Sequence, residues 1–244
     1  MSNAESVQEN TSIAIYTALF DGYDNLRLPP ADLQCDFFCF TDDPALSIEG
    51  ITCRVWPRKH EDPTRDSRMV KILSHLVLPE YDYTLWVDAS VELHFNDPRL
   101  LIEQHLMSHE LALLEHPYND NIYKELERCL SSGKDCPQLM QAQVRAYQAE
   151  GVPESTGMVA TGALLRKNSS PMIIQLNEAW WNEVCQFSRR DQLSFNPVIW
   201  RQKMKYALMD KLRWESPFFR CRYFTFHPHT RPPIDAGRQP SFSQ

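Results

Sequence analysis

Residues 83–98, YTLWVDASVELHFNDP, are the most informative segment of the sequence for the fold. An apolar run leads directly to Asp88, and polar residues then alternate with apolar ones as far as His94. Because successive side chains of a strand point to opposite faces, this alternation would place four polar groups on one side. Buried strands that end in acidic residues present ligands at the carboxyl edge of the sheet in α/β enzymes. The alternative is a half-buried edge strand with one solvated face.

The composition is that of a globular protein with an acidic balance. The 244 residues suit one large domain or two small ones, and 43% of them are hydrophobic. The net charge of −7 disfavours an extended nucleic-acid surface, so we expect no nucleic-acid partner. No apolar run approaches the ~20 residues that span a bilayer, so we expect no transmembrane segment. Residues 1–12 lack the basic and apolar regions of a secretory signal.

The cysteines indicate a reducing environment. Seven are present, which is an odd number, and no CxxC pair occurs among them. This pattern is typical of reduced thiols that act as small core residues, rather than of disulfides or a zinc site. We therefore expect a cytoplasmic location.

Periodicity and turn residues predict alternating strands and helices. Residues 12–20, 36–40 and 51–56 are expected to be strands, because aromatic and β-branched residues are frequent in them. Residues 65–78 carry apolar side chains at helical spacing and stop at Pro79, which predicts a helix. Further helices are expected at residues 97–107, 121–130, 137–149, 171–187 and 192–203, and further strands at 111–114, 158–165 and 218–226.

Together these elements predict an α/β fold with a mostly parallel central sheet flanked by helices. The C-terminal half is expected to elaborate this sheet, since the regular alternation holds only over the first ~115 residues. No repeat, low-complexity tract or linker divides the sequence. We therefore predict a single domain over residues 12–230, with residues 1–11 and 231–244 as flexible termini.

A group of basic residues lies on the predicted helix just before the opening stretch. Arg65, Arg68, Lys71 and His75 recur at intervals of three and four, so they would form one cationic stripe. A solvated helix face is one interpretation. A site for a phosphate-bearing ligand is the other, because guanidinium groups bind phosphate oxygens in bidentate fashion. The sequence contains none of the glycine-rich phosphate-loop or dinucleotide motifs that would supply an alternative phosphate site.

Two later segments also carry candidate site residues. Residues 188–196, SRRDQLSFN, contain Asp191, which would either cap the following helix or serve a site. Residues 227–232, HPHTRP, place two histidines after a strand. A neutral imidazole there would complete a metal site with Asp88, whereas an ordinary tail histidine would have no such role.

These segments resemble the nucleotide-diphospho-sugar glycosyltransferases of the GT-A fold. LWVDAS is similar to the strand that ends in their Asp-x-Asp, with Asp88 at the first acidic position and Ser90 at the second. DQLSFN is similar to the DQxxLN element of the glycogenin-like transferases, with Asp191 and Gln192 at its first positions. HPHTRP is similar to their C-terminal histidine loop, with His227 as the metal ligand.

A closer resemblance is to the glycosyltransferase-like family first catalogued as domain of unknown function number 616. It extends over residues 16–196 and rests on seven motifs in order. They are YTALFDGYD, DFFCFTD, RxxRxxKxxxH, LWVDAS, EHPYNDNIYKELERC, GMVATGALLRK and SRRDQLSFN.

The resemblance implies a single GT-A-like domain that moves a sugar from a nucleotide-diphosphate donor, with UDP as the expected nucleotide. A divalent cation, Mn²⁺ or Mg²⁺, and a glycan, lipid or protein acceptor follow from the same resemblance. The implied roles are donor binding by Asp42, Arg65, Arg68, Lys71, Asp88 and Ser90, catalysis by Asp191 and Gln192, acceptor contact by His116 and Tyr123, and metal binding by Asp88 and His227.

The departure from the family pattern lies at Ser90, which stands where a carboxylate is expected. We also expect the strand to break near Ser90, which would end the alternation of polar and apolar residues beyond it. Hard cations prefer carboxylate oxygen to a neutral hydroxyl. Asp88 would then hold the metal with Glu92 or His227, or Arg68 and Lys71 would neutralise the diphosphate without metal. Two other functions remain open. They are a non-catalytic nucleotide-sugar-binding domain, and a metal-dependent hydrolase that activates water with Asp88, Glu92 and the histidines.

Overall fold

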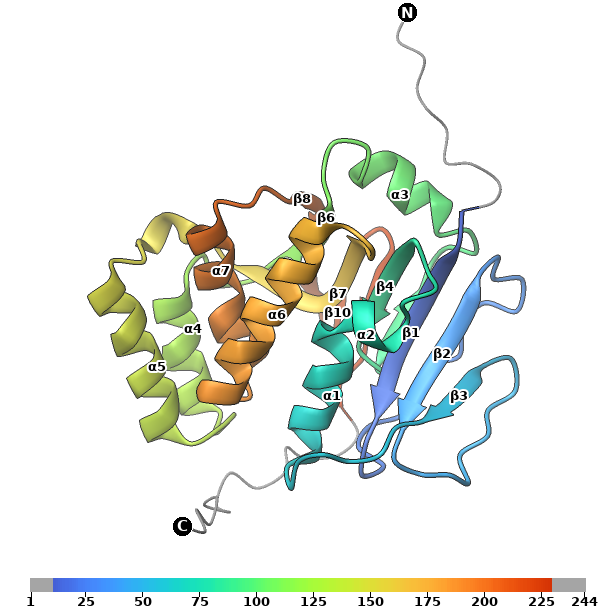
Figure 1. The fold of residues 1–244 in the computed structure, drawn as a ribbon, viewed down its shortest axis with the longest axis horizontal. Coiled ribbons are helices and arrows are strands. Elements are labelled where there is room, and N and C mark those ends of the chain that lie inside the picture. Colours follow the sequence, from blue (N-terminus) through green and yellow to red (C-terminus); the bar gives the residue numbers. More distant parts are fainter. Residues whose placement is uncertain (1–10, 230–244) are drawn as a thin grey trace, which may run out of the picture.

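A computed structural model describes residues 11–229 of the protein and shows a seven-stranded sheet with helices packed against it (Figure 1). The strand order is β3-β2-β1-β4-β7-β6-β8, and four of the six neighbouring pairs are parallel. Both antiparallel pairs involve β7. The strands are β1 (Ile13–Leu19), β2 (Asp36–Thr41), β3 (Thr52–Val55), β4 (Tyr83–Val87), β6 (Leu111–Glu115), β7 (Val159–Lys167) and β8 (Ala207–Lys211).

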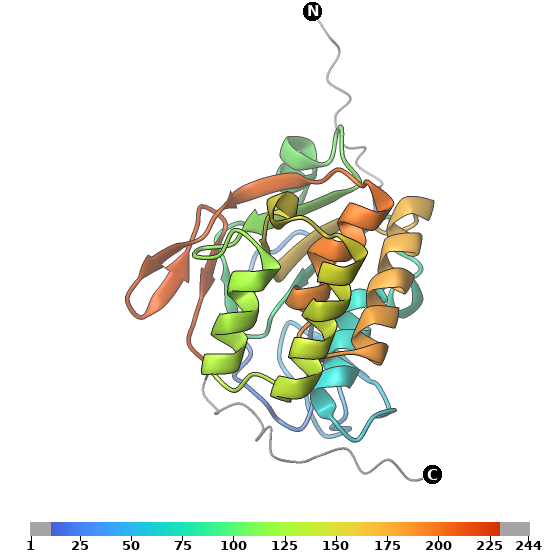
Figure 2. The same ribbon diagram turned by 90° about the vertical axis from the view of Figure 1, so that its left-hand side faces the viewer.

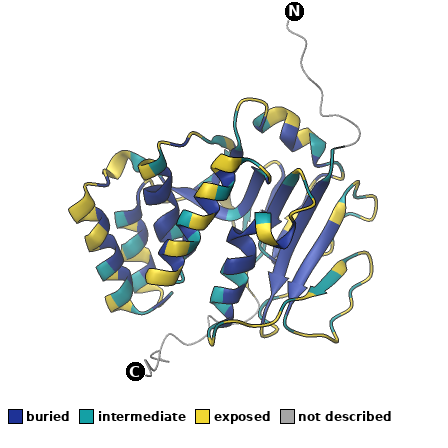
Figure 3. Ribbon diagram, in the orientation of Figure 1, coloured by how far each residue is buried: buried dark blue, intermediate teal, exposed yellow. Residues whose placement is uncertain are grey.

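Alternation along the buried strands gives the sheet two apolar faces. On β1, Tyr16 joins the core on the face covered by α1, α6 and α7, whereas Ile15 joins the core on the face covered by α3. The central strands are almost entirely buried, while the helices expose their outer faces (Figure 3). The helices are α1 (Pro63–Ile72), α2 (Ser74–Val77), α3 (Arg99–His105), α4 (Ile122–Ser131), α5 (Pro137–Glu150), α6 (Pro171–Gln186) and α7 (Asp191–Gln202), with a short 3-10 helix at Glu154–Thr156.

A second, four-stranded antiparallel sheet has the order β5-β11-β10-β9. It pairs the segment just after Asp88 with the C-terminal part of the described chain. The orange-red C-terminal strands project at the left of Figure 2. The four strands are β5 (Val91–Leu93), β9 (Arg213–Glu215), β10 (Phe218–Arg220) and β11 (Phe224–Phe226).

The predicted α/β class and mostly parallel sheet are confirmed, and the small sheet is the expected C-terminal elaboration. The strands β8 and β9 were not predicted, because their short, partly exposed segments show no clear alternation. The expected break of the strand near Ser90 is confirmed, so the four alternating polar residues do not share the face of one strand. Strand β4 ends at Val87, and β5 starts only at Val91. In β5, Glu92 is exposed between two buried residues. Residues 91–93 therefore match the alternative interpretation, an edge strand with one solvated face.

The predicted helix over residues 65–78 is interrupted. Leu73 has φ −88° and ψ 48°, which separates α1 from α2. His75 therefore belongs to a different helix from Arg68 and Lys71. Its ring contacts Asn177 instead of continuing the cationic stripe. Within residues 11–229, no helix is both long and apolar enough to cross a membrane. The predicted flexible termini lie outside the described residues, except for residue 11.

All seven cysteines lie within the described residues as free thiols. Burial raises the pKa of Cys39 to about 12, and Cys185 is exposed. Because the thiolate is the reactive form, Cys39 should be alkylated by iodoacetamide at pH 8 at least ~100-fold more slowly than Cys185. Peptide mass spectrometry over a time course measures both rates. In urea, which unfolds the protein, the two cysteines should be alkylated at similar rates. Equal alkylation rates in the native protein would contradict the buried position of Cys39.

Candidate functional site

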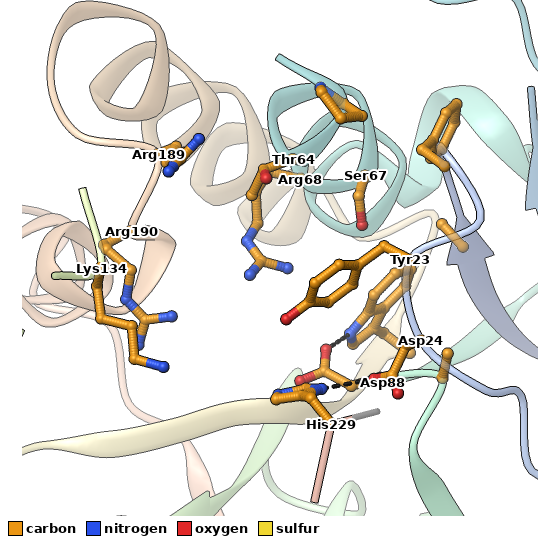
Figure 4. Close-up of a pocket in the computed structure, with 15 residues that line it drawn as sticks. Tyr23, Asp24, Thr64, Ser67, Arg68, Asp88, Lys134, Arg189, Arg190 and His229 are labelled. Atoms are coloured by element: carbon orange, nitrogen blue, oxygen red, sulfur yellow. Dashed lines mark hydrogen bonds and ion pairs between the residues drawn. The ribbon is translucent and has the colours of Figure 1, made fainter. Parts of the chain in front are cut away.

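A cavity of about 170 Å³ lies at the carboxyl ends of β1 and β4 (Figure 4). These two strands are neighbours, but β2 and β3 extend the sheet on one side of β1 while β4 lies on the other. In α/β sheets, ligands bind outside the strand ends at such a reversal of strand order. The polar lining residues are Tyr23, Asp24, Thr64, Ser67, Arg68, Asp88, Lys134, Arg189, Arg190 and His229.

Asp88 reaches this cavity because it directly follows β4. Its backbone N–H donates to the carbonyl of Gly162 on the neighbouring strand at 2.9 Å. Its carboxylate Oδ1 accepts a hydrogen bond from the indole Nε1 of Trp86 at 2.9 Å. The side chain is 31% exposed. Asp88 is therefore held in a fixed orientation while its carboxylate remains open to the cavity.

Directly behind the cavity lies a buried ionic cluster formed by Asp191, Lys71 and Arg68. Asp191 Oδ2 is 2.6 Å from Lys71 Nζ, and its Oδ1 is 2.9 Å from Arg68 Nε. The hydroxyl of Thr161 donates to Asp191 at 2.9 Å and accepts from Lys71 at 3.1 Å. Lys71 Nζ is also 3.9 Å from Asp88 Oδ1. Because of these contacts, Asp191 fixes both cations next to Asp88.

The cluster also sets the charge states of its members. Burial acts to raise the pKa of Asp191, but the Arg68 and Lys71 cations outweigh burial and hold this pKa well below its usual range. Burial lowers the pKa of Lys71, and the charges of Asp191 and Asp88 oppose that shift. We therefore treat Asp191 as a carboxylate and Lys71 as its paired cation.

Two alternatives from the sequence are wrong in light of this cluster. Lys71 is 1% exposed, so it does not belong to a solvated helix face. Asp191 is 2% exposed and does not cap α7, because Arg190 occupies the N-cap position and no side chain caps the helix there. Asp191 also does not line the cavity. Its carboxylate contacts cations rather than open space.

Arg190 and Lys134 add positive charge on the far side of the cavity from Tyr23 (Figure 4). The guanidinium of Arg190 lies 3.6 Å from Glu125 Oε1. Lys134 is half-buried, and burial followed by the charge of Arg190 lowers its pKa. Within residues 11–229, no hydrogen bond or ion pair engages the ammonium group of Lys134. No sequence pattern indicated Lys134, which lies in an aperiodic connection between α4 and α5.

His116 supports this side of the cavity from behind. Its Nδ1 accepts the backbone N–H groups of Tyr118 and Asn119 at 3.3 and 2.8 Å. Its Nε2 lies 3.7 Å from Glu125 Oε2, and the other oxygen of Glu125 faces Arg190. Burial lowers the pKa of His116, so the imidazole is neutral at pH 7. His116 thus contacts Glu125 rather than the cavity.

The other predicted site residues do not line the cavity. The guanidinium of Arg65 bonds to backbone carbonyls at the end of α6, and Tyr123 Oη donates to the Val152 carbonyl at 2.6 Å. Asp42 accepts the N–H of Asp21 at 3.0 Å, which fixes the turn between β1 and Tyr23. Gln192 Nε2 donates a hydrogen bond to the Val159 carbonyl at 3.2 Å. The backbone carbonyl of Ser90 accepts the backbone N–H of His227 at 3.1 Å.

The structure does not pair the predicted metal ligands Asp88 and His227. The imidazole Nε2 of His227 lies 2.7 Å from Glu92 Oε2 on the small sheet. The cavity is instead lined by His229, whose Nδ1 is 2.5 Å from Asp24 Oδ2. Within residues 11–229, no three His, Cys, Asp or Glu side chains gather in a metal-binding arrangement.

Gly162 is required next to Asp88 for steric reasons. A Cβ at this position would lie 2.6 Å from Cε1 of Phe226 and 3.1 Å from Asp88 Oδ2. We expect Gly162→Ala to lower the free energy of unfolding by about 1–3 kcal/mol, which is typical of overpacking. Urea denaturation measures this loss. Adding Phe226→Leu should recover part of it by removing the ring, and a neutral single variant would contradict the close contact.

Comparison with known proteins identifies the family. The family model "TOD1/MUCI70, glycosyltransferase-like domain" matches residues 51–225. The chain belongs to this family. The matched region contains Arg68, Lys71, Asp88, Lys134 and Asp191, which are the main charged residues of the cavity and of the cluster behind it.

Two curated relatives from Arabidopsis thaliana carry different names. The chain is 27% identical over 214 residues to "Probable hexosyltransferase MUCI70", covering 76% of this chain and 37% of the relative. It is 24% identical over 234 residues to "Alkaline ceramidase TOD1", covering 80% of this chain and 50% of the relative. The chain thus spans between about a third and a half of the length of these relatives.

Proposed function

We propose that this domain transfers a hexose from a nucleoside diphosphate sugar, with UDP as the nucleotide, to a glycan, lipid or protein acceptor. The supporting observation is the charge of the cavity at the β1–β4 strand reversal. Four lining side chains are cationic, Arg68, Lys134, Arg189 and Arg190, whereas two are carboxylates. Membership of a glycosyltransferase-like family and similarity to a relative named as a hexosyltransferase support the same function.

The proposed chemistry uses these cations to stabilise the leaving diphosphate. Glycosyl transfer develops negative charge on the diphosphate, and fixed donors in a partly enclosed site stabilise that charge without reorganising. The guanidinium of Arg68 points into the cavity toward Asp88 (Figure 4). Asp88 is the carboxylate beside these groups that is open to the cavity, so we assign it to the transferred sugar. Asp191 becomes a positioning residue for Arg68 and Lys71, rather than the catalytic group expected from sequence.

Binding of the donor nucleotide is the first test. UDP at 100 times its Kd should stabilise the native state by about 2.7 kcal/mol through mass action. For a domain of this size, that corresponds to a rise in Tm of roughly 5–10 °C. Thermal-shift measurements with UDP, UDP-hexoses and other nucleoside diphosphates cover the donor class, with uridine as the control lacking phosphate. No shift with any diphosphate at millimolar concentration would overturn the proposal.

Amide hydrolysis is the second candidate, because one relative is named as an alkaline ceramidase. The cavity favours the first candidate, since four cationic side chains complement a diphosphate better than a neutral lipid amide. Release of sphingoid base from a ceramide, together with no turnover of any nucleotide sugar, would reverse this order.

A further inference from the structure

The surroundings of Asp88 do not suit a divalent cation. Mg²⁺ and similar hard cations need several oxygen ligands, usually including carboxylates. One oxygen of Asp88 already accepts the indole N–H of Trp86 at 2.9 Å. The ammonium group of Lys71 lies 3.9 Å from the same oxygen and would repel a cation bound there.

The nearby carboxylates are committed to other cationic partners or to histidines. Asp191 holds Arg68 and Lys71. Asp24 lies against His229, and Glu92 contacts the imidazole of His227. Each of these pairs would have to break before the carboxylate could bind a metal ion. In the described part of the chain, the residues present therefore do not fit the divalent cation that the sequence resemblance implies.

The cations of the cavity offer a replacement for the metal. Arg68 is oriented by Asp191, and Arg190 is oriented by Glu125. No hydrogen bond or ion pair within residues 11–229 engages the ammonium group of Lys134, which is half-buried beside Arg190. An unpaired cation that is partly removed from water gains most from an anionic ligand, because the ligand replaces lost hydration.

We propose that the domain binds the donor diphosphate without a divalent cation, through Lys134, Arg190 and Arg68. This inference rests on the proposed function and specifies how the same cavity neutralises the leaving group. Arg68 and Arg190 provide planar donors for phosphate oxygens, and Lys134 provides a point charge. Asp88 is then left free for the sugar rather than being consumed as a metal ligand.

Titration calorimetry with UDP tests this inference directly. Binding is measured in EDTA and in excess Mg²⁺ or Mn²⁺. The Kd in EDTA should agree with the Kd in either metal within about threefold. Lys134→Met should weaken UDP binding at least tenfold in EDTA, whereas Lys134→Arg should retain most of it. Lys205→Met removes an exposed lysine outside the cavity and is the matched control. Circular dichroism confirms that each variant is folded.

A second titration, with inorganic pyrophosphate in EDTA, separates the inference from the proposed function. UDP binding that tightens tenfold or more with Mn²⁺ or Mg²⁺ would overturn the metal-free site while leaving the transferase function intact. Pyrophosphate binding that Lys134→Met weakens, without any binding of UDP, would support the site and overturn the nucleotide-sugar function. Absence of binding by both ligands under all conditions would overturn both. An unchanged Kd for UDP and pyrophosphate in Lys134→Met would show that Lys134 does not contribute to binding of the diphosphate.

Discussion

Asp191→Asn is expected to lower the free energy of unfolding by about 3–5 kcal/mol, because removing one partner of a buried ion pair leaves the other charge unpaired. Asp88, at 3.9 Å, would be the one carboxylate left near the Lys71 ammonium among residues 11–229. Arg68 would lose its partner at the edge of the cavity. Urea denaturation measures the loss, and the same variant should bind UDP more weakly because Arg68 is no longer held.

A double-mutant cycle with Lys71→Met identifies the ion pair as the cause. Combining Lys71→Met with Asp191→Asn should cost clearly less than the sum of the single changes, since the fully buried Lys71 ammonium is then absent and only the partly exposed Arg68 is left without Asp191. Additive losses, or a loss below about 1 kcal/mol for Asp191→Asn alone, would contradict this account.

The same cluster predicts the direction of acid sensitivity. Although burial acts to raise the pKa of Asp191, the Arg68 and Lys71 cations hold it below the unfolded value of about 3.9. A group with a depressed folded-state pKa contributes fully above its unfolded pKa and loses that contribution as the pH falls further. Stability should therefore fall below about pH 4, and this part of the fall should be absent in Asp191→Asn. Urea midpoints at pH 5 and pH 3 measure the difference.

Asp88→Asn is expected to reduce turnover of the sugar donor by about 10²–10³-fold, in line with the loss of one fixed electrostatic group at a reacting centre. Asparagine retains the Oδ1 acceptor for Trp86, and the side chain is 31% exposed, so stability should change little. UDP affinity should also stay close to that of the wild type, since the cations bind the diphosphate. Release of UDP from UDP-hexose, in a coupled assay, measures the rate.

The matched control for Asp88→Asn is Glu103→Gln on α3. This exposed carboxylate lies on the helix that covers the opposite face of the sheet, and it does not line the cavity. It should leave the rate unchanged. A normal rate in Asp88→Asn would show that Asp88 does not act on the sugar.

Local sequence patterns located the main elements but not their contacts. Arg65 and Arg68 look equivalent in sequence, since both lie on the predicted cationic stripe. In the structure, Arg65 bonds to carbonyls of α6, whereas Arg68 faces the cavity. The stripe predicted by helical spacing gives no information about which neighbouring element each residue meets. Only the packing of α1 between the sheet and α6 separates the two roles.

Local sequence patterns were enough to predict the apolar strand at residues 83–87, the position of Asp88 at its end and the α/β class, because these depend on periodicity over a few residues. The three-dimensional fold was needed to show that Lys71 and Asp191 form one buried pair and that Lys134 lines the cavity. Lys71 and Asp191 lie in segments far apart in the chain, and the aperiodic connection containing Lys134 has no pattern to read. Their contacts arise only when the helices pack on the sheet, since burial and ion pairing depend on distances that local spacing does not encode.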